Sequence, residues 1–561
     1  MAFHVFRIYR LLMAVFLLFG ALVVRLFYLQ IIDGPLLTAQ SVGMRVQEVP
    51  VEVARGEILD RNGQPLTNTA QHFSVVVFPE QIVSVSQTAA QLAVVTGLPR
   101  ENILEQLAQA GYPFKMKTDL DAVTAQKING LHLPGVLCVA EKKRYGSSAL
   151  AAHIVGYINQ ADNKGVSGIE GMYDEILRGN QPEYVAAVVD AGQRLIPGLG
   201  YKRIRLNNGA APSNVVLTID SRIQKIVEGV MDRHVPKGAV VILRPSTGEI
   251  LACASRPNFD ANNLGDYLQH VTAPLLNRAL AAYQPGSVFK LVVAAAALES
   301  GAVRPQDIFY DQGYIDVGSL RFKGWDYERG PRGRLTFTDA IAYSSNPVLI
   351  EVALRLGPAK VIEYAHKLGF GQHTGLNFES EADGNLPAAD ALYPGDLANL
   401  AIGQGLLEAT PLQVASLVAT IVNDGVKVEP YIVSKFTSPE GVVIKQFPVS
   451  RGVRVLSRAT AAELRAMMLA VTRYGTGQAA YVDGIGSAGK TGSAETGRTD
   501  GKGKGINHAW FAGYAPLENP QYVVVVFVEE GMSGGDVAAP VFREIVAEIY
   551  ANTNGNSVNA R

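Results

Sequence analysis

Ser287 and Lys290 stand three residues apart where a helix is expected to begin, and this spacing suits nucleophilic catalysis. Pro285 and Gly286 interrupt the chain just before them, and the Ala- and Leu-rich run at 291–298 favours helix. Residues three apart on a helix share a face, so the hydroxyl and the amine should project together. An amine that burial keeps neutral can accept the proton of a serine hydroxyl and so activate it. The pair therefore predicts a serine nucleophile with a lysine base; the alternative is a surface lysine on a misplaced helix.

A second pair of polar side chains, Ser344 and Asn346, precedes Pro347. Because proline restricts the residue before it, we expect this stretch to form a turn whose side chains can point into a cleft. A hydroxyl there could relay a proton, and an amide could hold a substrate carbonyl or orient Lys290. The alternative is an ordinary turn, since the same Ser-x-Asn spacing recurs in the C-terminal tail at 557–559.

Lys490, Thr491, Gly492 and Ser493 form a third motif, and its Lys-Thr-Gly sequence occurs once in the chain. The glycine of this motif, together with Gly489, allows a backbone to approach closely, as when the edge of a sheet receives an extended ligand. A lysine and a threonine at such an edge could bind a substrate carboxylate. The alternative is a basic edge residue that protects the sheet against aggregation.

The elements that must position these motifs are visible as apolar runs between turn residues. Strands are expected at both ends of the region from 213 to 550, and its middle is rich in helix. This order suggests one sheet assembled from both ends of the region and covered by helices. The expected strands are 215–219, 239–243, 249–254, 508–514 and 522–528, and helices are expected at 220–233 and 540–550. The preceding region combines a strand at 73–78 with helices at 81–97 and 101–111.

The composition excludes several classes of protein. The chain of 561 residues is 48% hydrophobic and 18% charged, which is enough to build several globular domains. Its formal net charge of −1 gives no indication of nucleic-acid binding. Cys138 and Cys253 are the two cysteines, and the chain has no Cys-x-x-Cys or His-Glu-x-x-His sequence. We therefore expect two free, buried thiols and neither zinc binding nor thiol redox chemistry.

An apolar stretch at 11–32 is long enough to span a bilayer if Arg25 extends its charged end toward the interface. Arg7 and Arg10 precede this stretch, which predicts a cytoplasmic N-terminus and an exported remainder. A cleaved signal peptide is the alternative, but no small-residue cleavage site is evident near Gly34. The prediction is a retained membrane anchor and an activity outside the membrane.

Charged and polar residues outside the three motifs have a structural interpretation. Arg55, Asp60 and Arg61 lie in a turn-rich stretch and are expected to form an ion-pair cluster, because no nucleophile is near them. Glu170 lies among glycines and is expected to pin backbone amides. Ser533 fits the Gly-x-Ser-x-Gly pattern of esterases, but such a triad needs a histidine after the serine, and the last histidine of the chain precedes it.

Ser-x-x-Lys at 287–290, Ser-x-Asn at 344–346 and Lys-Thr-Gly at 490–492, in this order, are the signature of penicillin-binding proteins and class A β-lactamases. Over nearly its whole length the chain resembles the class B penicillin-binding proteins, the membrane-anchored peptidoglycan DD-transpeptidases. The stretches that also carry the resemblance are 55–63, 168–170, 277–279, 402–405, 410–413 and 534–540.

The resemblance implies an α+β fold with four parts. These are a short cytoplasmic segment and single transmembrane helix at 1–32, an elongated mixed pedestal domain at 33–212, a serine transpeptidase domain at 213–550 and a flexible tail at 551–561. The transpeptidase domain would have a central antiparallel sheet flanked by helices.

By position, the resemblance also implies catalytic roles. Ser287 would attack the penultimate D-Ala carbonyl of a stem pentapeptide and release the terminal D-Ala. Lys290 would accept the serine proton. Ser344 would relay a proton to the leaving amine, and Asn346 would share hydrogen bonds with Lys290.

The Lys-Thr-Gly motif would bind the substrate. Lys490 and Thr491 would hold the terminal carboxylate, and Gly492 and Ser493 would continue the edge along which the substrate lies. The backbone N–H groups of Ser287 and Ser493 would form the oxyanion hole. An amine of a neighbouring stem peptide would then take the acyl group to form a cross-link, whereas a β-lactam would acylate the serine and stay. The resemblance implies no metal or organic cofactor.

Rival functions remain open beside this one. A catalytically idle or sensor-type penicillin-binding protein, or a DD-carboxypeptidase, would carry the same motifs. A bifunctional enzyme would need a glycosyltransferase domain, for which 33–212 is short, and a β-lactamase would need a deacylating base, for which no Glu-x-x-x-Asn motif lies between Ser344 and Lys490. The partner implied by the resemblance is a membrane glycosyltransferase or another wall-synthesis protein. The process served is elongation, septation or sporulation, and the stretch 508–514 favours the first or the last.

Overall fold

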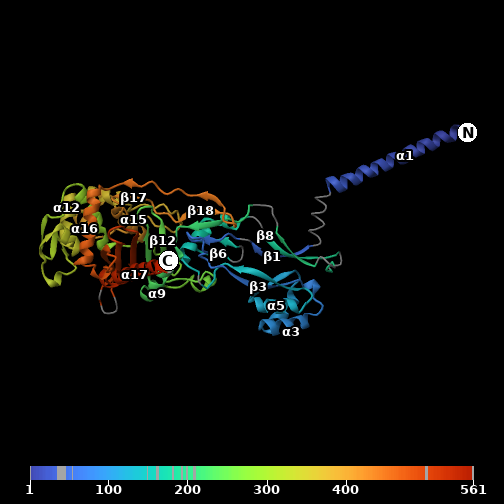
Figure 1. The fold of residues 1–561 in the computed structure, drawn as a ribbon, viewed down its shortest axis with the longest axis horizontal. Helices are drawn as coiled ribbons and strands as arrows, with labels where there is room; N and C mark the ends of the chain where they lie inside the picture. The colour runs from blue at the N-terminus through green and yellow to red at the C-terminus, as the bar shows by residue number, and fades with distance from the viewer. Residues whose placement is uncertain are drawn as a thin grey trace. The chain divides into compact units, whose positions relative to one another are not determined.

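The computed structural model describes residues 2–33, 46–53, 55–147, 149–159, 163–179, 182–190, 194–196, 200–205, 210–499, 503 and 505–558 (Figure 1). The chain forms two compact units, each built from separate stretches of sequence. Unit 1 comprises Met1–Ala54, Ala70–Lys143 and Asn180–Ala211, and unit 2 comprises Arg55–Thr69, Arg144–Gly179 and Pro212–Arg561. Unit 2 therefore includes two stretches that the sequence analysis assigned to the region 33–212.

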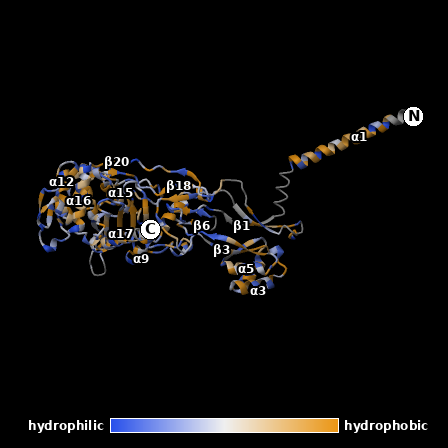
Figure 2. Ribbon diagram, viewed as in Figure 1, coloured by the Kyte–Doolittle hydropathy of each residue, from blue (hydrophilic) through white to orange (hydrophobic). Residues whose placement is uncertain are grey.

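The chain begins with a long apolar helix, α1 (Ala2–Phe27), which continues as a π-helical segment (Tyr28–Ile32). Residues Phe6–Ile32 are long and apolar enough to cross a membrane. Figure 2 shows hydrophobic residues recurring along α1. The large apolar side chains of this helix are exposed, which would be unfavourable in water. These features fit the span predicted at 11–32.

The rest of unit 1 consists of two small antiparallel sheets with helices packed on one of them. In the first sheet, β3 (Ala70–Val77) lies between β4 (Phe114–Leu120) and β5 (Val136–Lys143), and helices α3 (Val85–Thr96), α4 (Arg100–Gln109) and α5 (Ala122–Gly130) supply part of its core. The second sheet has the order β1 (Val46–Val53), β8 (Pro182–Val188) and β9 (Tyr201–Arg205). The strand predicted at 73–78 and the helix at 101–111 form within a few residues. The helix predicted from 81 starts later, at 85, because Ser84 caps it.

The main sheet of unit 2 has five antiparallel strands drawn from both ends of the predicted domain, as expected. Their order is β12 (Ile250–Arg256), β11 (Gly238–Leu243), β23 (Tyr522–Val528), β22 (Gly505–Ala515) and β21 (Ala488–Thr499). Every residue of β11 and β12 is buried, because helices cover both faces of the sheet.

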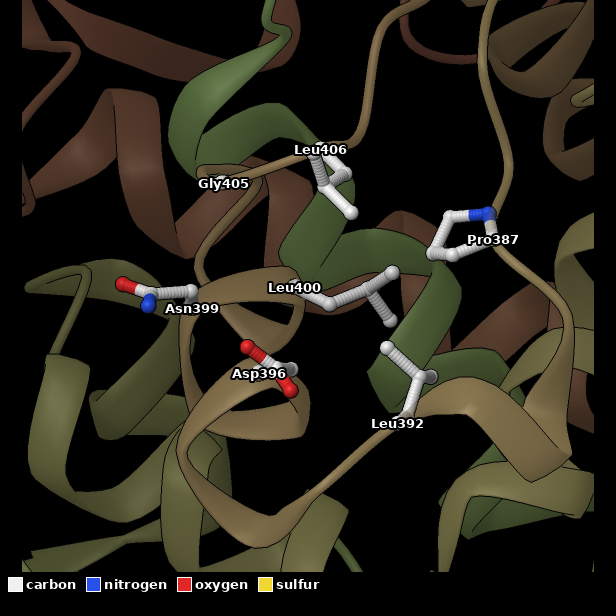
Figure 3. Close-up of a pocket in the computed structure, with 7 residues that line it drawn as sticks. All are labelled: Pro387, Leu392, Asp396, Asn399, Leu400, Gly405 and Leu406. Carbon is white, nitrogen blue, oxygen red and sulfur yellow. The ribbon is translucent and has the colours of Figure 1, made fainter.

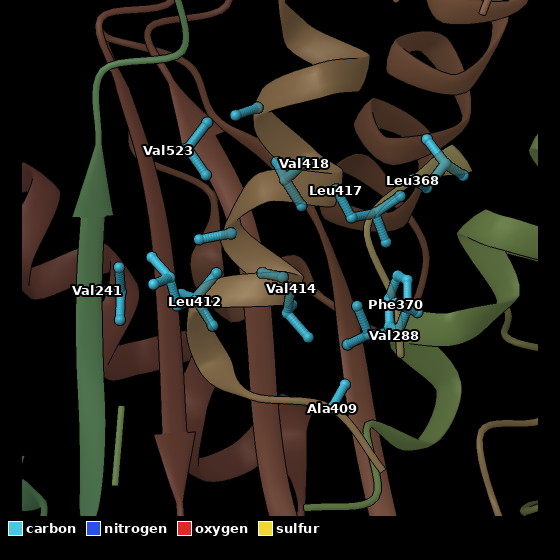
Figure 4. Packing of buried hydrophobic residues seen from close by; sticks show 14 of the residues in the cluster. Val241, Val288, Leu368, Phe370, Ala409, Leu412, Val414, Leu417, Val418 and Val523 are labelled. Atoms are coloured by element: carbon cyan, nitrogen blue, oxygen red, sulfur yellow. The ribbon is translucent and has the colours of Figure 1, made fainter. Parts of the chain in front are cut away.

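Helix α15 (Pro411–Val422) covers one face of this sheet and is buried at all of its positions. It lies against β11 and β23, and Leu412 shares a hydrophobic cluster with Val241 and Val523 (Figure 4). Helices α9 (Ser221–His234) and α17 (Ala539–Val558) enclose a second cluster on the opposite face. The sheet therefore holds its edge strand β21 against two hydrophobic cores, which makes that edge a rigid support for side chains.

Two elements of unit 2 differ from the sequence prediction. The strand expected at 215–219 forms as β10 (Asn214–Leu217), but it pairs with β18 (Val433–Thr437) and β2 (Ile58–Leu59) in a separate sheet. A short strand with three consecutive buried apolar residues fits either sheet, and the pairing partner is set only by tertiary packing. The final helix continues to Val558, past the end predicted at 550. The two cysteines are free and buried, as predicted.

The predicted ion-pair cluster forms in unit 2, with a different membership. Arg55 pairs with Glu170 at 2.6 Å and with Asp174 at 2.7 Å, and Arg144 pairs with Glu170 at 2.7 Å. The expectation that Glu170 pins backbone amides is wrong: its fully buried carboxylate holds two arginines. Asp60 has that backbone role instead and caps neighbouring amides.

We expect Glu170→Ala to lower the free energy of unfolding by about 3–5 kcal/mol, because two arginines would keep their burial and lose their shared carboxylate. Chemical denaturation of the detergent-solubilised chain measures this change. Glu175→Ala on the adjacent exposed surface is the matched control and should cost little. Equal effects of the two substitutions would contradict a role for the buried cluster.

Candidate active site

The helix predicted at Ser287 begins with a 3-10 turn (Gly286–Phe289) and continues as α10 (Lys290–Glu299). Gly286 has φ +54°, donates its N–H to Gly403 O at 3.0 Å, and a Cβ at this position would lie 2.6 Å from Ser493 O. A side chain at residue 286 would therefore collide with β21. Glycine at this position lets the start of the helix lie directly against the Lys-Thr-Gly strand, which brings Ser287 and Ser493 to the same place.

Lys290 is fully buried, as predicted, and its Nζ touches three oxygen atoms. These are Ser344 O at 2.6 Å, Asn346 Oδ1 at 2.7 Å and Ser344 Oγ at 3.1 Å. Ser344 O and Asn346 Oδ1 can only accept hydrogen bonds, so they bind the two hydrogens of a neutral Lys290 amine. The lone pair of that amine is then free to accept a hydrogen bond from a hydroxyl. Burial lowers the pKa of Lys290 well below its usual value, and the nearby Lys490 lowers it further.

Ser344 connects the two lysines of the site. Its Oγ lies 3.1 Å from Lys290 Nζ and 3.0 Å from Lys490 Nζ. The residue occupies the predicted turn, between α11 (Phe337–Ala342) and α12 (Asn346–Leu356), with φ +59°. Pro347 starts α12 rather than breaking a helix, since proline suits the first turn. A hydroxyl between two amines is placed to pass a proton from one to the other.

Lys490 extends from β21, which is the edge strand of the sheet as predicted. Its side chain is fully buried, so the alternative of a solvent-facing edge guard is wrong. Its Nζ donates to Ser344 Oγ and to Thr491 O, each at 3.0 Å. Burial lowers the pKa of Lys490 to about 7. The two amines of the site therefore gain and lose protons far more readily than surface lysines do.

The glycines of this strand serve the protein's own packing. A Cβ on Gly489 would lie 2.5 Å from the Phe511 ring, and one on Gly492 would lie 2.8 Å from Pro285 O. The close approach that was expected at these glycines is made by the chain itself: they let the sheet and the start of the helix approach β21.

A cleft of about 1020 Å³ opens at this junction. Of the predicted site residues, its lining includes Ser287, Ser344, Asn346, Thr491 and Ser493, whereas the lining does not include Lys290, Lys490 and Gly492. Side chains that the sequence analysis did not single out for the site also line it: Gln284, Arg321, Phe322, Lys323, Trp325, Arg329, Asn399, Ile402, Gln404, Thr476, Glu495, Asn507 and Asp536. They come from separate segments, so no local spacing could have revealed them. A hollow of about 90 Å³ adjoins the cleft and shares Asn399 and Gly405 with its lining (Figure 3).

Thr476 is one of these additional residues, and its Oγ1 lies 2.6 Å from Thr491 Oγ1. The contact fixes the direction of the Thr491 hydroxyl, which is expected to meet the substrate carboxylate. We expect Thr476→Val to weaken β-lactam binding about two- to tenfold through loss of one hydrogen bond. Acylation rate measured against ligand concentration gives this value.

Thr472→Val is the matched control for Thr476→Val, because Thr472 Oγ1 bonds Ser487 O in the interior and Thr472 is absent from the cleft lining. Unchanged binding in Thr476→Val, or an equal loss in the control, would show that the contact does not orient Thr491.

Ser533 also lines the cleft, but it has no base. Within the described residues, its Oγ accepts one hydrogen bond, from Asp536 N at 3.3 Å. His508, the last histidine, accepts from the backbone of Glu530 through Nδ1 at 3.2 Å. The esterase interpretation therefore finds no support in the geometry.

Comparisons with known proteins place the chain in a family. The model of the penicillin-binding protein transpeptidase domain matches residues 238–547, and that of the penicillin-binding protein dimerisation domain matches residues 50–197. Stage V sporulation protein D of Bacillus subtilis is 33% identical, over 95% of this chain and 84% of its own length. Peptidoglycan D,D-transpeptidase MrdA of Haemophilus influenzae is 28% identical, over 96% and 90%.

A solved structure agrees as well. Penicillin-binding protein 3 of Mycobacterium tuberculosis, in complex with aztreonam, is 26% identical and superposes with a TM-score of 0.65 over 91% of this chain and 97% of its own. The chain therefore belongs to the class B penicillin-binding proteins, a family of peptidoglycan DD-transpeptidases.

Proposed function

We propose that this protein cross-links peptidoglycan stem peptides through an acyl-enzyme on Ser287, and that β-lactams acylate the same serine. The observation that carries the proposal is the Ser344 hydroxyl, which lies 3.1 Å and 3.0 Å from the buried amines of Lys290 and Lys490. Ser344 and Ser287 both line the cleft, and the two lysines are fully buried beneath its surface. Two buried amines around one hydroxyl can transfer protons. They are a poor means of stabilising the fold, because burying a charged group costs free energy.

In the acylation step, Lys290 takes the proton of Ser287 as the serine oxygen attacks the penultimate D-Ala carbonyl. The two hydrogens of the neutral amine stay on Ser344 O and Asn346 Oδ1, so its lone pair is available. Ser344 Oγ then gives its own proton to the departing D-Ala nitrogen and is reprotonated by a lysine amine. The C–N bond of the terminal D-Ala breaks, and an ester to Ser287 remains.

Substrate orientation comes from the strand. Lys490 and Thr491 would attract the terminal carboxylate, and the N–H groups of Ser287 and Ser493 would stabilise the oxyanion. Removal of one such donor typically costs about 100- to 1000-fold in rate. The close contact of residue 286 with Ser493 O favours this pairing of N–H groups.

The second half-reaction needs an acceptor amine, and the cleft of about 1020 Å³ has room for more than one dipeptide. An attacking water would instead make the protein a DD-carboxypeptidase. The size of the cleft favours a peptide amine as the acceptor, and an idle or sensor-type protein would have no use for the paired amines.

The test is an assay of the full chain in detergent with a stem pentapeptide donor and an acceptor amine. We expect D-Ala release, a cross-linked product that depends on the acceptor, and a β-lactam adduct on Ser287 by mass spectrometry. Release of D-Ala without any cross-linked product would establish a carboxypeptidase instead. Absence of both the adduct and D-Ala release would indicate a catalytically idle protein. Fast loss of the adduct would indicate a β-lactamase.

We also propose that α1 anchors the chain and that unit 2 acts outside the cytoplasmic membrane, because Arg7 and Arg10 precede the apolar span. A membrane-impermeant thiol reagent should label Val453→Cys on the exposed surface in spheroplasts and should not label Ala2→Cys. The reverse pattern would refute this orientation. A membrane glycosyltransferase is the proposed partner, and co-purification with the full chain tests it.

A further inference from the structure

The turn at 343–346, which contains Ser344 and Asn346, is held by hydrogen bonds to a segment that lies outside the three sequence motifs. The segment runs from β13 (Ile308–Asp311) through β14 (Tyr314–Val317) and β15 (Leu320–Lys323) to a 3-10 turn (Tyr327–Arg329). Three of its residues bond to 343–346 in turn. Trp325 Nε1 donates to Tyr343 O at 3.0 Å, Ser345 Oγ donates to Asp311 Oδ2 at 2.6 Å, and Asn346 Nδ2 donates to Lys323 O at 3.0 Å.

The turn at 343–346 needs such support. Ser344 has φ +59°, a left-handed conformation that costs free energy in a residue other than glycine and persists only where its surroundings fix it. Its Oγ must also stay between two amines, with 3.1 Å to one and 3.0 Å to the other. A small rotation of this turn would break one of the two contacts, so the groups that hold the neighbouring residues control the proton path.

Asp311 is the strongest of the three supports. Its side chain is 3% exposed, and its two oxygens accept from Ser345 Oγ and from Gly313 N at 2.7 Å. Among the described residues, no lysine, arginine or histidine forms an ion pair with it. A buried carboxylate without a cation partner is costly, which is a reason to look for a function.

The charge of this carboxylate acts on Lys290. Lys490 on β21, Asp311 on β13 and Asp326 beside the 3-10 turn are the charged groups that act on Lys290. Asp326 is paired with Arg332 at 2.6 Å, which offsets its charge. Asp311 has no such partner within the described chain, so its negative charge acts on Lys290 without this offset.

We propose that Asp311 is a positioning residue for acylation: through Ser345 Oγ it holds the turn that keeps Ser344 Oγ between Lys290 and Lys490, and it supplies a negative charge that acts on Lys290. This inference rests on the proposed function of the same site and adds a residue from a segment outside all three motifs. Asp311 acts through Ser345 and through the electric field, without touching substrate.

The two parts of the role can be separated by substitution. Asp311→Asn keeps an oxygen acceptor for Ser345 and removes the charge. Without that charge the pKa of Lys290 falls further, so the neutral amine is present at lower pH and the rising limb of the acylation rate moves to lower pH. Ser345→Ala keeps the charge and removes the contact, so the limb should stay in place while the rate falls about tenfold.

The experiment measures acylation of the full chain in detergent by a fluorescent penicillin, from acid to alkaline pH, for Asp311→Asn, Ser345→Ala, Asp311→Ala and the double variant. We expect the limb to shift in both Asp311 variants. We also expect Asp311→Ala and Ser345→Ala to be non-additive in rate, because each breaks the same contact. Asp220→Asn is the matched control: this carboxylate is also buried, but it caps α9 and pairs with Arg222, and it should not move the limb.

Stability needs its own measurement, because Ser345 Oγ also caps α12 through Val348 N at 3.3 Å. Thermal midpoints of all variants report that effect, and Asp311→Asn keeps the test valid should Asp311→Ala fail to fold. The inference would be overturned if the rising limb of the acylation rate stayed at the same pH in Asp311→Asn and if the rate losses of Asp311→Ala and Ser345→Ala were additive in the double variant. A wild-type chain that takes no label at Ser287 would instead overturn the proposed function, so the two failures are distinguishable.

Discussion

Ser287→Ala is expected to abolish covalent labelling by β-lactams and to lower D-Ala release by about 10⁴-fold or more, as loss of a catalytic nucleophile does elsewhere. The other two serine hydroxyls that were considered as catalytic groups, those of Ser344 and Ser533, are already bonded to other groups. Ser344 Oγ bonds both lysines, and Ser533 Oγ is bonded to the backbone of Asp536. Labelling stoichiometry by gel fluorescence and D-Ala release in the same preparation measure the loss.

The control for this experiment is Ser533→Ala, which removes the rival hydroxyl from the same cleft. It should still take up one label per chain. Ser287 is half-buried, and its alanine variant should keep the thermal midpoint of the parent. Persistence of the label in Ser287→Ala, or its disappearance in Ser533→Ala, would transfer the nucleophile to another residue and end the acyl-enzyme proposal for Ser287.

Lys290→Met is expected to lower the acylation rate by about 10²- to 10⁴-fold, the range typical for removal of a general base. Methionine fills the volume but cannot accept a proton. It also leaves Ser344 O and Asn346 Oδ1 without the amine hydrogens they receive at 2.6 Å and 2.7 Å. Single-turnover acylation kinetics measure the loss. Lys427→Met, which removes a partly buried lysine outside the cleft lining, should keep the parental rate.

The pH dependence of the parent follows from the same group. Burial and Lys490 hold the pKa of Lys290 well below 10.5, so the amine of the folded protein is neutral at pH values where a surface lysine is charged. The acylation rate should therefore rise with pH through a point well below 10.5, and that limb should vanish in Lys290→Met. A limb near 10.5 in the parent, or one unchanged in the variant, would show that another group takes the serine proton.

The three motifs were visible in the sequence because each is short and local. Ser287 and Lys290 are one turn apart, Ser344 and Asn346 share a turn, and Lys490 stands between glycines in a short Lys-Thr-Gly motif. Local spacing is set by the geometry of helix and turn, so these residues could be singled out before any fold was known. The assembly of one sheet from both ends of the region could be anticipated as well, since four of its five strands, β11, β12, β22 and β23, were recognisable as short apolar runs.

The less local features were not predicted. Glu170 was expected to bind backbone, but it holds Arg55 and Arg144 from distant stretches. The glycines of the Lys-Thr-Gly strand were expected to allow close backbone approach, but the sequence did not show that Phe511 and Pro285 are the groups that approach them. In each case the residue type was informative, and its partner came from far away in the chain.

By itself, the sequence determined which groups could do chemistry and which stretches were strand, helix or membrane span. The tertiary structure decided how the groups meet: Ser344 Oγ within 3.1 Å of two lysines, both lysines fully buried, and Asp311 behind the turn. The physical reason is that burial and long-range contact depend on how the whole chain packs. Packing shifts the pKa of an amine and fixes a hydroxyl between two others, and neither effect is encoded in the spacing of a motif.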